Sequence, residues 1–180
     1  MYTRSGIALC AAVALAACAT PQRAEAPAPH VGEPVSAAEL VRWDISIPPS
    51  GEGLPPGSGT ARAGLKVYEQ HCLACHGAKG VGKPADTLAG GVGSLGTKKP
   101  LRTVGSYWPY STTLFDYVRR AMPLNIPLSL ADDEVYAVSA YVLFLNGIVS
   151  EDAVMDAQSL PQVRMPNRDG FISDWPPRRN

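Results

Sequence analysis

Three segments of the chain place apolar residues at the three-to-four-residue spacing of an amphipathic helix. The first segment begins at Thr60, a residue type that caps helix N-termini. Its apolar stripe consists of Ala61, Gly64, Leu65, Tyr68 and Cys72. The pattern predicts a helix that starts at Thr60 and runs into Cys72.

The second segment, STTLFDYVRRAMP, has Leu114, Phe115 and Val118 at helical spacing. An acidic residue near its start and two basic residues near its end match the helix dipole. Pro123 restricts the residue before it to extended geometry. We therefore expect Met122 to follow the helix in an extended conformation.

The third segment, SLADDEVYAVSAYVLFLNG, starts with Ser129 and Asp132 in an arrangement similar to a capping box. Gly147 follows its end. Its apolar stripe consists of Val135, Val138, Val142 and Leu145. This segment predicts the last helix of a compact helical centre.

Composition limits what surrounds that centre. The 180 residues suffice for one domain with extensions, and 17 prolines and 17 glycines predict long irregular stretches outside the helices. The formal net charge is zero and only 18% of residues are charged, which gives no electrostatic reason to expect a nucleic-acid partner.

The N-terminus has the pattern of an export signal. Arg4 precedes an apolar run that is too short to span a bilayer comfortably. The run ends in LAAC, which resembles a bacterial lipobox, so residues 1–17 are predicted to be a signal peptide and Cys18 a lipidated residue. Ordinary cleavage after residue 26, with loss of Cys18, is the alternative. The first interpretation predicts a periplasmic protein that its lipid anchors to the membrane.

Export leaves two cysteines, Cys72 and Cys75, and His76 follows the second directly. A zinc site needs four ligands, and the sequence lacks a second CxxC or a paired HxxxH. The strand–turn–helix context of a thioredoxin-like pair is missing, and a plain disulfide gives His76 no role. CxxCH is instead the attachment signature of haem c.

The spacing explains the attachment. Cysteines three residues apart project from one face of a helical turn, so both sulfurs can reach the two vinyl groups on one porphyrin edge. The adjacent imidazole then lies under the ring. Cys72 and Cys75 are therefore predicted to form the thioethers and His76 to be the proximal iron ligand.

A sixth iron ligand is sought among the methionines and the other histidines. Met122 is predicted, because a methionine held extended after a helix can cross the haem face. Met165 also precedes a proline but lies far beyond the last helix. His71 is too close to Cys72 to reach the opposite face, and His30 lies in a proline-rich leader. Met155 completes the set of candidates.

Residues 59–150 resemble class I cytochromes c. The matching pieces are Gly64 and Tyr68 before CLACH, the loop GAKGVGKPADTLAGG, the AMP methionine and the closing AYVLFL. The resemblance implies an all-α fold with three main helices around one covalently bound haem. It also implies that the first and last helices cross at Gly64 and Tyr141, and that the carbonyl of Pro84 orients the proximal histidine.

A narrower resemblance covers the flanks. WDISIPPSGEGLPPGSGT, VGSYWPYSTTLFDYVRRAMP and VRMPNRDGFISDWP look like the cytochrome subunits of molybdenum-containing sulfite or sulfane dehydrogenases of bacterial sulfur oxidation. With one CxxCH the chain would be a single-haem member. The resemblance implies such a dehydrogenase as electron donor and a downstream cytochrome or terminal oxidase as acceptor.

A haem with both axial positions filled passes single electrons and does not itself transform a substrate. The chain is therefore predicted to be an electron carrier rather than an enzyme. A haem enzyme or a gas or redox sensor with an open distal site is the competing class. A structural or interaction module with an incidental haem is the third.

Two flanks complete the predicted organisation. Residues 18–58 comprise the lipidated N-terminus, a proline-rich tether and an apolar part, and residues 151–180 form a C-terminal extension. Two interpretations are open for the apolar part: it packs on its own domain or on the partner. The apolar residues concerned are Leu40, Trp43, Ile45 and Ile47.

Several side chains near the predicted haem also have two interpretations. Tyr107 and Trp108 either wall the crevice and bind a propionate or are ordinary core aromatics. Arg102, Arg119 and Arg120 either meet an acidic partner face or are solvated.

Overall fold

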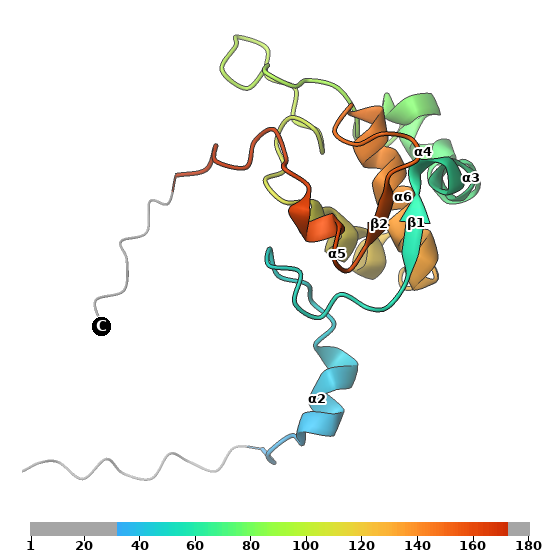
Figure 1. Ribbon diagram of the computed structural model, residues 1–180, viewed down its shortest axis with the longest axis vertical. Coiled ribbons are helices and arrows are strands. Elements are labelled where there is room, and N and C mark those ends of the chain that lie inside the picture. Colours follow the sequence, from blue (N-terminus) through green and yellow to red (C-terminus); the bar gives the residue numbers. More distant parts are fainter. Residues whose placement is uncertain (1–31, 173–180) are drawn as a thin grey trace, which may run out of the picture. The chain divides into compact units, whose positions relative to one another are not determined.

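The computed structural model describes residues 32–172 (Figure 1). The chain divides into two units, residues 1–41 and 42–180. The predicted signal peptide, Cys18 and His30 lie outside the described residues. None of the helices in the described part is both long enough and apolar enough to span a membrane.

Helix α2 (Ala37–Trp43) crosses the boundary between the two units and has no buried residue. The hydroxyl of Ser36 accepts a hydrogen bond from the backbone N–H of Glu39, which caps its first turn. Leu40 and Trp43 are exposed in this structure, with 82% of Trp43 accessible to solvent. For these two residues both interpretations stay open.

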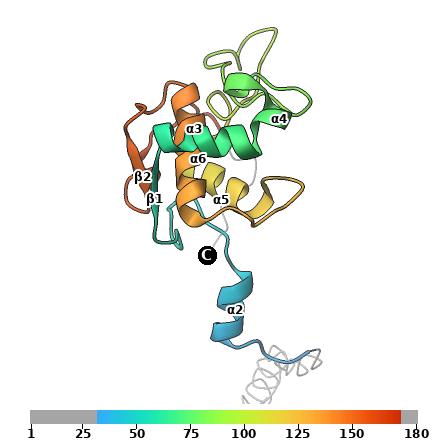
Figure 2. The same cartoon turned by 90° about the vertical axis from the view of Figure 1, so that its right-hand side faces the viewer.

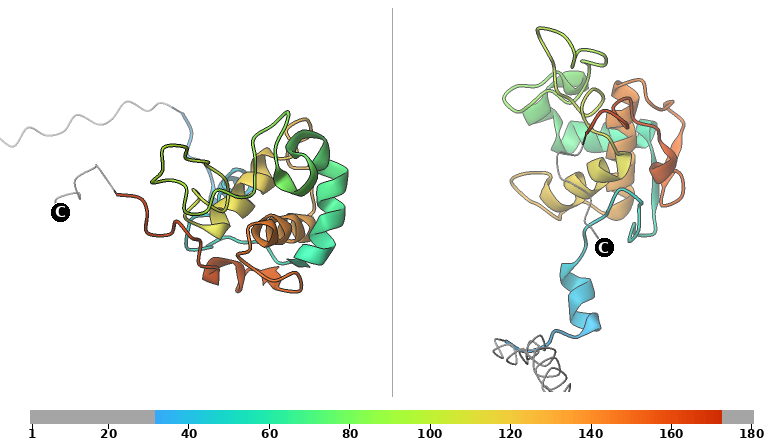
Figure 3. Two further views of the ribbon diagram at one scale, coloured as in Figure 1. Left: turned by 90° about the horizontal axis from the view of Figure 1, so that it is seen from above. Right: turned by 90° about the vertical axis from the view of Figure 1, so that its left-hand side faces the viewer.

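The second unit is mostly helical. The predicted helices are confirmed as α3 (Ala61–His71), α5 (Ser111–Ala121) and α6 (Asp132–Leu145). Short elements complete it: β1 (Ser58–Thr60), α4 (Leu73–His76), η1 (Ala78–Gly80), β2 (Val154–Asp156) and η2 (Leu160–Gln162). The irregular segment 81–110 joins η1 to α5 and forms the long loops in Figure 3.

Helix α3 lies across α6 (Figure 2). A Cβ atom on Gly64 would lie 1.9 Å from the carbonyl oxygen of Ala137, so only glycine permits this approach. The rings of Tyr68 and Tyr141 pack beside the crossing with centroids 5.1 Å apart. The expected meeting of Gly64 and Tyr141 is confirmed.

Two helix starts can be compared with their predictions. Thr60 caps α3 as predicted, because its hydroxyl accepts from the N–H of Ala63 at 3.2 Å. The prediction for α6 was partly wrong: its N-cap is Ala131, and the carboxylate of Glu134 accepts from the N–H of Ala131. Ser129 lies before the helix and takes no part in this cap.

Helix α6 occupies the centre of the core. Residues 135–143 are all buried, so the helix has a buried surface far wider than the predicted stripe. Neighbours on several sides explain this: α3, α5, β1 and β2 all pack against it. Between α5 and α6, the ring centroids of Phe115 and Tyr136 lie 4.4 Å apart.

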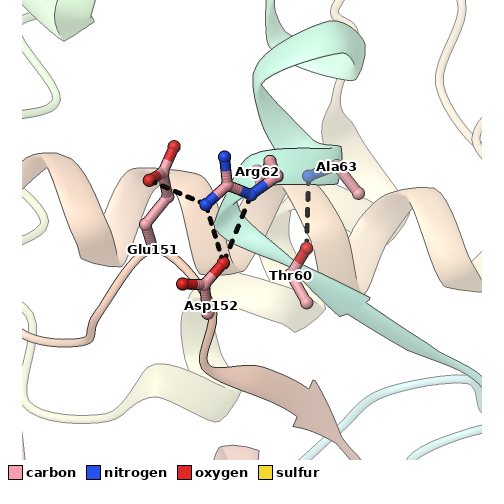
Figure 4. A network of polar contacts seen from close by, with 5 residues as sticks. All are labelled: Thr60, Arg62, Ala63, Glu151 and Asp152. Atoms are coloured by element: carbon pink, nitrogen blue, oxygen red, sulfur yellow. Dashed lines mark hydrogen bonds and ion pairs between the residues drawn. The ribbon is translucent and has the colours of Figure 1, made fainter.

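The two extensions belong to the same core. Strand β1 precedes α3, β2 follows α6, and they pair antiparallel with Gly59 opposite Met155. Arg62 adds ion pairs to Glu151 at 3.2 Å and to Asp152 at 2.9 Å (Figure 4). These three side chains are exposed to solvent, which screens their charges, so the ion pairs add little stability.

Residues 44–58 pack on the domain rather than away from it. Ile47 is 5% exposed, and its N–H donates to Asp116 of α5 at 2.9 Å. The hydroxyl of Thr112 donates to the carbonyl of Pro49, and that of Tyr136 to the carbonyl of Pro55. For Ile47, packing on its own domain is therefore the confirmed interpretation.

The C-terminal extension also covers the domain. Leu160 and Met165 are buried, and the hydroxyl of Ser111 donates to the carbonyl of Leu160 at 2.6 Å. The side-chain amide of Asn167 donates to the carbonyl of Tyr107. The core of the helical domain therefore includes residues from the segments that precede and follow it in the sequence.

Candidate haem site

The CxxCH motif lies at the junction of two helices. Cys72 ends α3, and its N–H donates to the carbonyl of Tyr68 at 2.8 Å. The N–H groups of Cys75 and His76 then both donate to the carbonyl of Cys72, at 3.1 and 2.9 Å. The backbone from Cys72 to His76 thus forms one helical turn, and the roles of the three side chains in holding haem stay predictions.

The two thiols differ in environment. Cys75 is exposed, whereas Cys72 packs against the hydrophobic core. Burial, reinforced by the charge of Cys75, raises the pKa of the Cys72 thiol to about 11. Both cysteines are free thiols, so both are available for bonds to carbon.

One hydrogen bond determines how His76 can bind a metal. Its Nδ1 lies 2.8 Å from the backbone carbonyl oxygen of Asp86. A carbonyl can only accept, so Nδ1 carries the hydrogen and Nε2 keeps the lone pair that a metal needs. Such a bond also orients the ring of a metal-binding histidine.

The prediction for Pro84 was wrong in this respect, because the carbonyl that meets His76 belongs to Asp86. The path of the loop explains the difference. Lys83 N–H donates to the carbonyl of Ala85 at 2.7 Å, and Ala85 N–H donates to the carbonyl of Cys75 at 2.9 Å. This turn brings the chain back to the motif after the proline and places the next carbonyl against the imidazole.

The loop that carries Asp86, residues 77–90, has a dense set of hydrogen bonds; we call it the His loop. Gly82 N–H donates to the carbonyl of His76 and Leu88 N–H to that of Gly80. The phenol of Tyr68 donates to the carbonyl of Gly77 at 2.8 Å. Burial, with a smaller effect of the Cys72 charge, raises the pKa of Tyr68 to about 12, so this donor stays protonated.

Asn146 anchors the end of the His loop, a role that the sequence analysis missed. Its Oδ1 accepts from Gly90 N–H at 3.0 Å, and its Nδ2 donates to the carbonyls of Leu88 at 3.1 Å and Val142 at 2.9 Å. In the sequence Asn146 showed only the end of the last helix. No local pattern connects it with a loop more than 50 residues earlier.

Met122 has the geometry that its proline predicted. Helix α5 ends at Ala121, and Met122 follows with φ −121° and ψ 147°, which is extended. Its N–H still donates to the carbonyl of Val118 at 3.1 Å, so the residue is held at the helix end. The side chain is partly exposed.

The other methionines of the described part fill the core. Met155 is 5% exposed and Met165 is 1% exposed, and both belong to the buried cluster around α6. These side chains are committed to packing. Met122 therefore stays the predicted axial ligand.

Tyr107 and Trp108 lie on the segment that leads into α5. Trp108 packs against the core and meets Tyr117 edge to face at 5.6 Å. Tyr107 is 37% exposed, stacks edge to face on Phe171 and has the guanidinium of Arg102 5.5 Å from its ring. Their predicted contact with haem stays a prediction.

The arginine pair at the end of α5 is engaged within the chain. Arg120 forms an ion pair with Asp116, and Arg119 forms one with Asp132 at 3.2 Å. Burial raises the pKa of Asp116, but bonds from Arg120 and Ile47 N–H and the charges of both arginines outweigh it, so the pKa lies below its ordinary value.

The donor set suits an iron porphyrin. Within residues 32–172, no three side chains of the His, Cys, Asp and Glu types are grouped to hold a bare metal ion. An imidazole with Nε2 free and two thiols three residues apart are what the attachment of haem c needs, because the porphyrin supplies the remaining nitrogens.

Comparisons with known proteins agree with this assignment. Residues 59–142 match the family model described as cytochrome C oxidase, cbb3-type, subunit III. The crystal structure of the sulfane dehydrogenase SoxCD from Paracoccus pantotrophus is 40% identical, with a TM-score of 0.76. The match covers 81% of this chain and 72% of that one. A search of curated proteins found no match.

The likeness to SoxCD extends beyond residues 59–142, because 81% of the chain is much more than that segment. It therefore includes at least part of the extensions that complete the core. Fold, donor set and similarity lead to one assignment. The chain belongs to the c-type cytochromes of the Sox type, with a class I cytochrome c fold and covalently bound haem c.

Proposed function

We propose that this electron-transfer cytochrome is a single-haem carrier that accepts electrons from a molybdenum-containing sulfite or sulfane dehydrogenase and passes them to a downstream cytochrome or oxidase. The observation that carries the proposal is the bond from His76 Nδ1 to the carbonyl of Asp86. It leaves Nε2 free for iron and holds the ring in a constant orientation, which a carrier needs for a small geometric change between redox states.

Each residue of the site has a role in this proposal. Cys72 and Cys75 would hold the haem through thioether bonds; adding each S–H across a vinyl double bond would consume no oxidant or reductant. His76 would bind the iron through Nε2, and Met122 would supply a thioether ligand. Bound haem c supplies an iron that cycles between ferrous and ferric states by one electron.

The likeness to SoxCD supports the choice of donor. SoxCD is a sulfane dehydrogenase, and this chain matches 72% of one of its chains at 40% identity. The likeness therefore supports a dehydrogenase of this kind as the electron donor.

The N-terminal pattern supports a place for the carrier. Export with lipidation at Cys18 puts the protein in the periplasm and attaches it to the membrane through residues that precede the domain. The mass of the mature protein tests this part separately. An N-terminal Cys18 with a diacylglyceryl group and an amide-linked acyl chain is expected, and a chain that begins after residue 26 without lipid would contradict it.

The experiment for electron transfer uses the oxidised full-length holoprotein. Sulfite or a sulfane substrate is added with and without the molybdenum dehydrogenase of the same source, and haem reduction is followed by absorbance. Rapid reduction that requires both enzyme and substrate is expected, and the effective substrate separates sulfite from sulfane chemistry. Failure of both substrates would contradict the proposed donor.

A second measurement tests the carrier class itself. The reduced holoprotein is exposed to carbon monoxide at neutral pH. A Met-ligated haem is expected to bind it poorly, whereas rapid saturating binding would favour an enzyme or sensor with an open distal site. Met122→Ala is the matched control that should bind carbon monoxide readily.

A further inference from the structure

The loop that carries Met122 has little internal support. Residues 122–131, here the Met loop, contain one backbone hydrogen bond of their own in the described structure, from Ile126 N–H to the carbonyl of Pro123. Three apolar side chains of its middle part are exposed: Leu124 (79%), Ile126 (47%) and Leu128 (61%). Such a loop opens at low cost unless its ends are held.

One ion pair connects the two ends. Arg119 lies in the last turn of α5, three residues before Met122, and Asp132 is the first residue of α6. Their Nε and Oδ1 atoms are 3.2 Å apart, and the side chains are only 22% and 37% exposed. Each charge also complements the dipole of its own helix end. The pair therefore closes the base of the Met loop.

The surroundings direct Arg119 to this partner. Asp116, the nearest other carboxylate on α5, accepts from both Arg120 and Ile47 N–H. Both of its oxygens are thus engaged by other donors. The rings of Phe115 on α5 and Tyr136 on α6 pack together with centroids 4.4 Å apart and keep the two helices in contact. The ends of both helices are consequently fixed where the ion pair forms.

We propose that Arg119 and Asp132 are positioning residues for the axial methionine, because their ion pair closes the base of the Met loop and holds Met122 against the haem iron. The inference rests on the proposed role of Met122 as sixth ligand. Without the pair, the loop opens more often, and the iron–sulfur bond is more easily replaced by an external ligand.

Competition by imidazole measures this directly. In the ferric full-length holoprotein, imidazole binds iron only after Met122 has left, so its apparent affinity reports the population of the open loop. Arg119→Gln and Asp132→Asn are each expected to raise the apparent imidazole affinity by about fivefold, the factor that corresponds to a partly exposed ion pair. Loss of the near-infrared Met-to-iron charge-transfer band follows the displacement.

Two controls separate positioning from general stability. Arg62→Gln removes an exposed ion pair of α3 and should leave the imidazole affinity unchanged. The charge swap Arg119→Asp with Asp132→Arg should bind imidazole more weakly than either single variant, although each charge then opposes its helix dipole. If the pair is merely structural, Arg119→Gln and Asp132→Asn will each lower the free energy of unfolding but leave imidazole binding to the folded protein unchanged.

Failure of the inference and failure of the proposed ligand are distinguishable. If Met122→Ala keeps the charge-transfer band, Met122 is not the ligand. If Met122→Ala loses the band while Arg119→Gln and Asp132→Asn bind imidazole with wild-type affinity, the ligand stands and the positioning role is overturned. A swap variant no better than the single variants also overturns it.

Discussion

The two loops that hold the proposed iron ligands are built in opposite ways. The His loop folds back on the CxxCH turn through the hydrogen bonds of Gly82, Ala85 and Leu88, and Asn146 ties its end to α6. The Met loop has one internal backbone bond in the described structure, and its apolar middle part is exposed. The support of the Met loop comes from its two ends.

This difference indicates that the two proposed ligands are held with different rigidity. A densely bonded loop presents a histidine in one orientation, whether or not the opposite ligand is bound. A loop held at its ends can exchange its methionine without disturbing the rest of the fold. We therefore expect changes on the His side to affect haem retention and stability, and changes on the Met side to affect ligation and potential.

Replacement of the ligands themselves should give the largest contrast. His76→Ala removes the residue whose ring is oriented by Asp86, and little correctly ligated holoprotein is expected. Met122→Ala should still yield protein with covalent haem, because Cys72 and Cys75 are intact, but with a reduction potential lower by on the order of 100 mV since the thioether favours ferrous iron. Haem staining and redox titration measure both, and equal haem loss in the two variants would remove the contrast.

The next largest effect is expected from Asp116, which links α5, the helix before the Met loop, to the segment that contains Ile47. Asp116→Asn weakens the contacts to Arg120 and Ile47 and should lower the free energy of unfolding by about 2 kcal/mol at neutral pH, by urea denaturation. Asp152→Asn, whose carboxylate is exposed, is the matched control and should change it by less than about 0.5 kcal/mol.

The pH dependence of this variant has a defined sign. The pKa of Asp116 is lower in the folded protein than its ordinary value of about 3.9. Its contribution is therefore complete above about pH 4 and is lost as the pH falls through the folded-state pKa. The difference in stability between wild type and Asp116→Asn should shrink in acid, and a difference that grows below about pH 4 would contradict the assignment.

A smaller effect is expected from the anchor of the His loop. Asn146→Ala removes the bonds to Gly90 and Leu88, which should cost about 1 to 2 kcal/mol and speed hydrogen exchange of the His loop amides. Asn146→Asp keeps the acceptor for Gly90 N–H but loses the donor, so an intermediate effect is expected. Equal acceleration in the Met loop would show that the two loops are not independent.

The smallest effect should come from the middle of the Met loop. Leu124 is 79% exposed, so Leu124→Ser should change the free energy of unfolding by less than about 0.5 kcal/mol. Thermal denaturation of the holoprotein measures this. A loss of several times that amount would mean that the exposed middle part supports the loop after all.

Local physical rules explain what could be predicted from the sequence. Helical spacing identified α3, α5 and α6, and the restriction before Pro123 gave Met122 its extended backbone. The CxxCH spacing requires only one turn of helix, so the arrangement of Cys72, Cys75 and His76 followed from the chain itself. Gly64 and Tyr141 came from a family resemblance, and the crossing of α3 and α6 bears them out.

Only the tertiary structure decided which groups contact and hold the predicted haem ligands and their loops. The carbonyl that orients His76 belongs to Asp86 rather than Pro84, because the turn at residues 83–85 returns the chain to Cys75. Asn146 meets the His loop across 56 and 58 positions of sequence. Arg119 and Asp132 meet because α5 and α6 pack together at the ends of the Met loop.

The physical reason is the range of the interactions. Helix formation, capping and proline geometry act over a few residues, so a sequence displays them directly. The partner of a loop carbonyl or of a charged side chain depends on where distant segments lie after the core has packed. The sequence by itself determined which residues are predicted to bind haem, and the packed core determined which groups contact those residues.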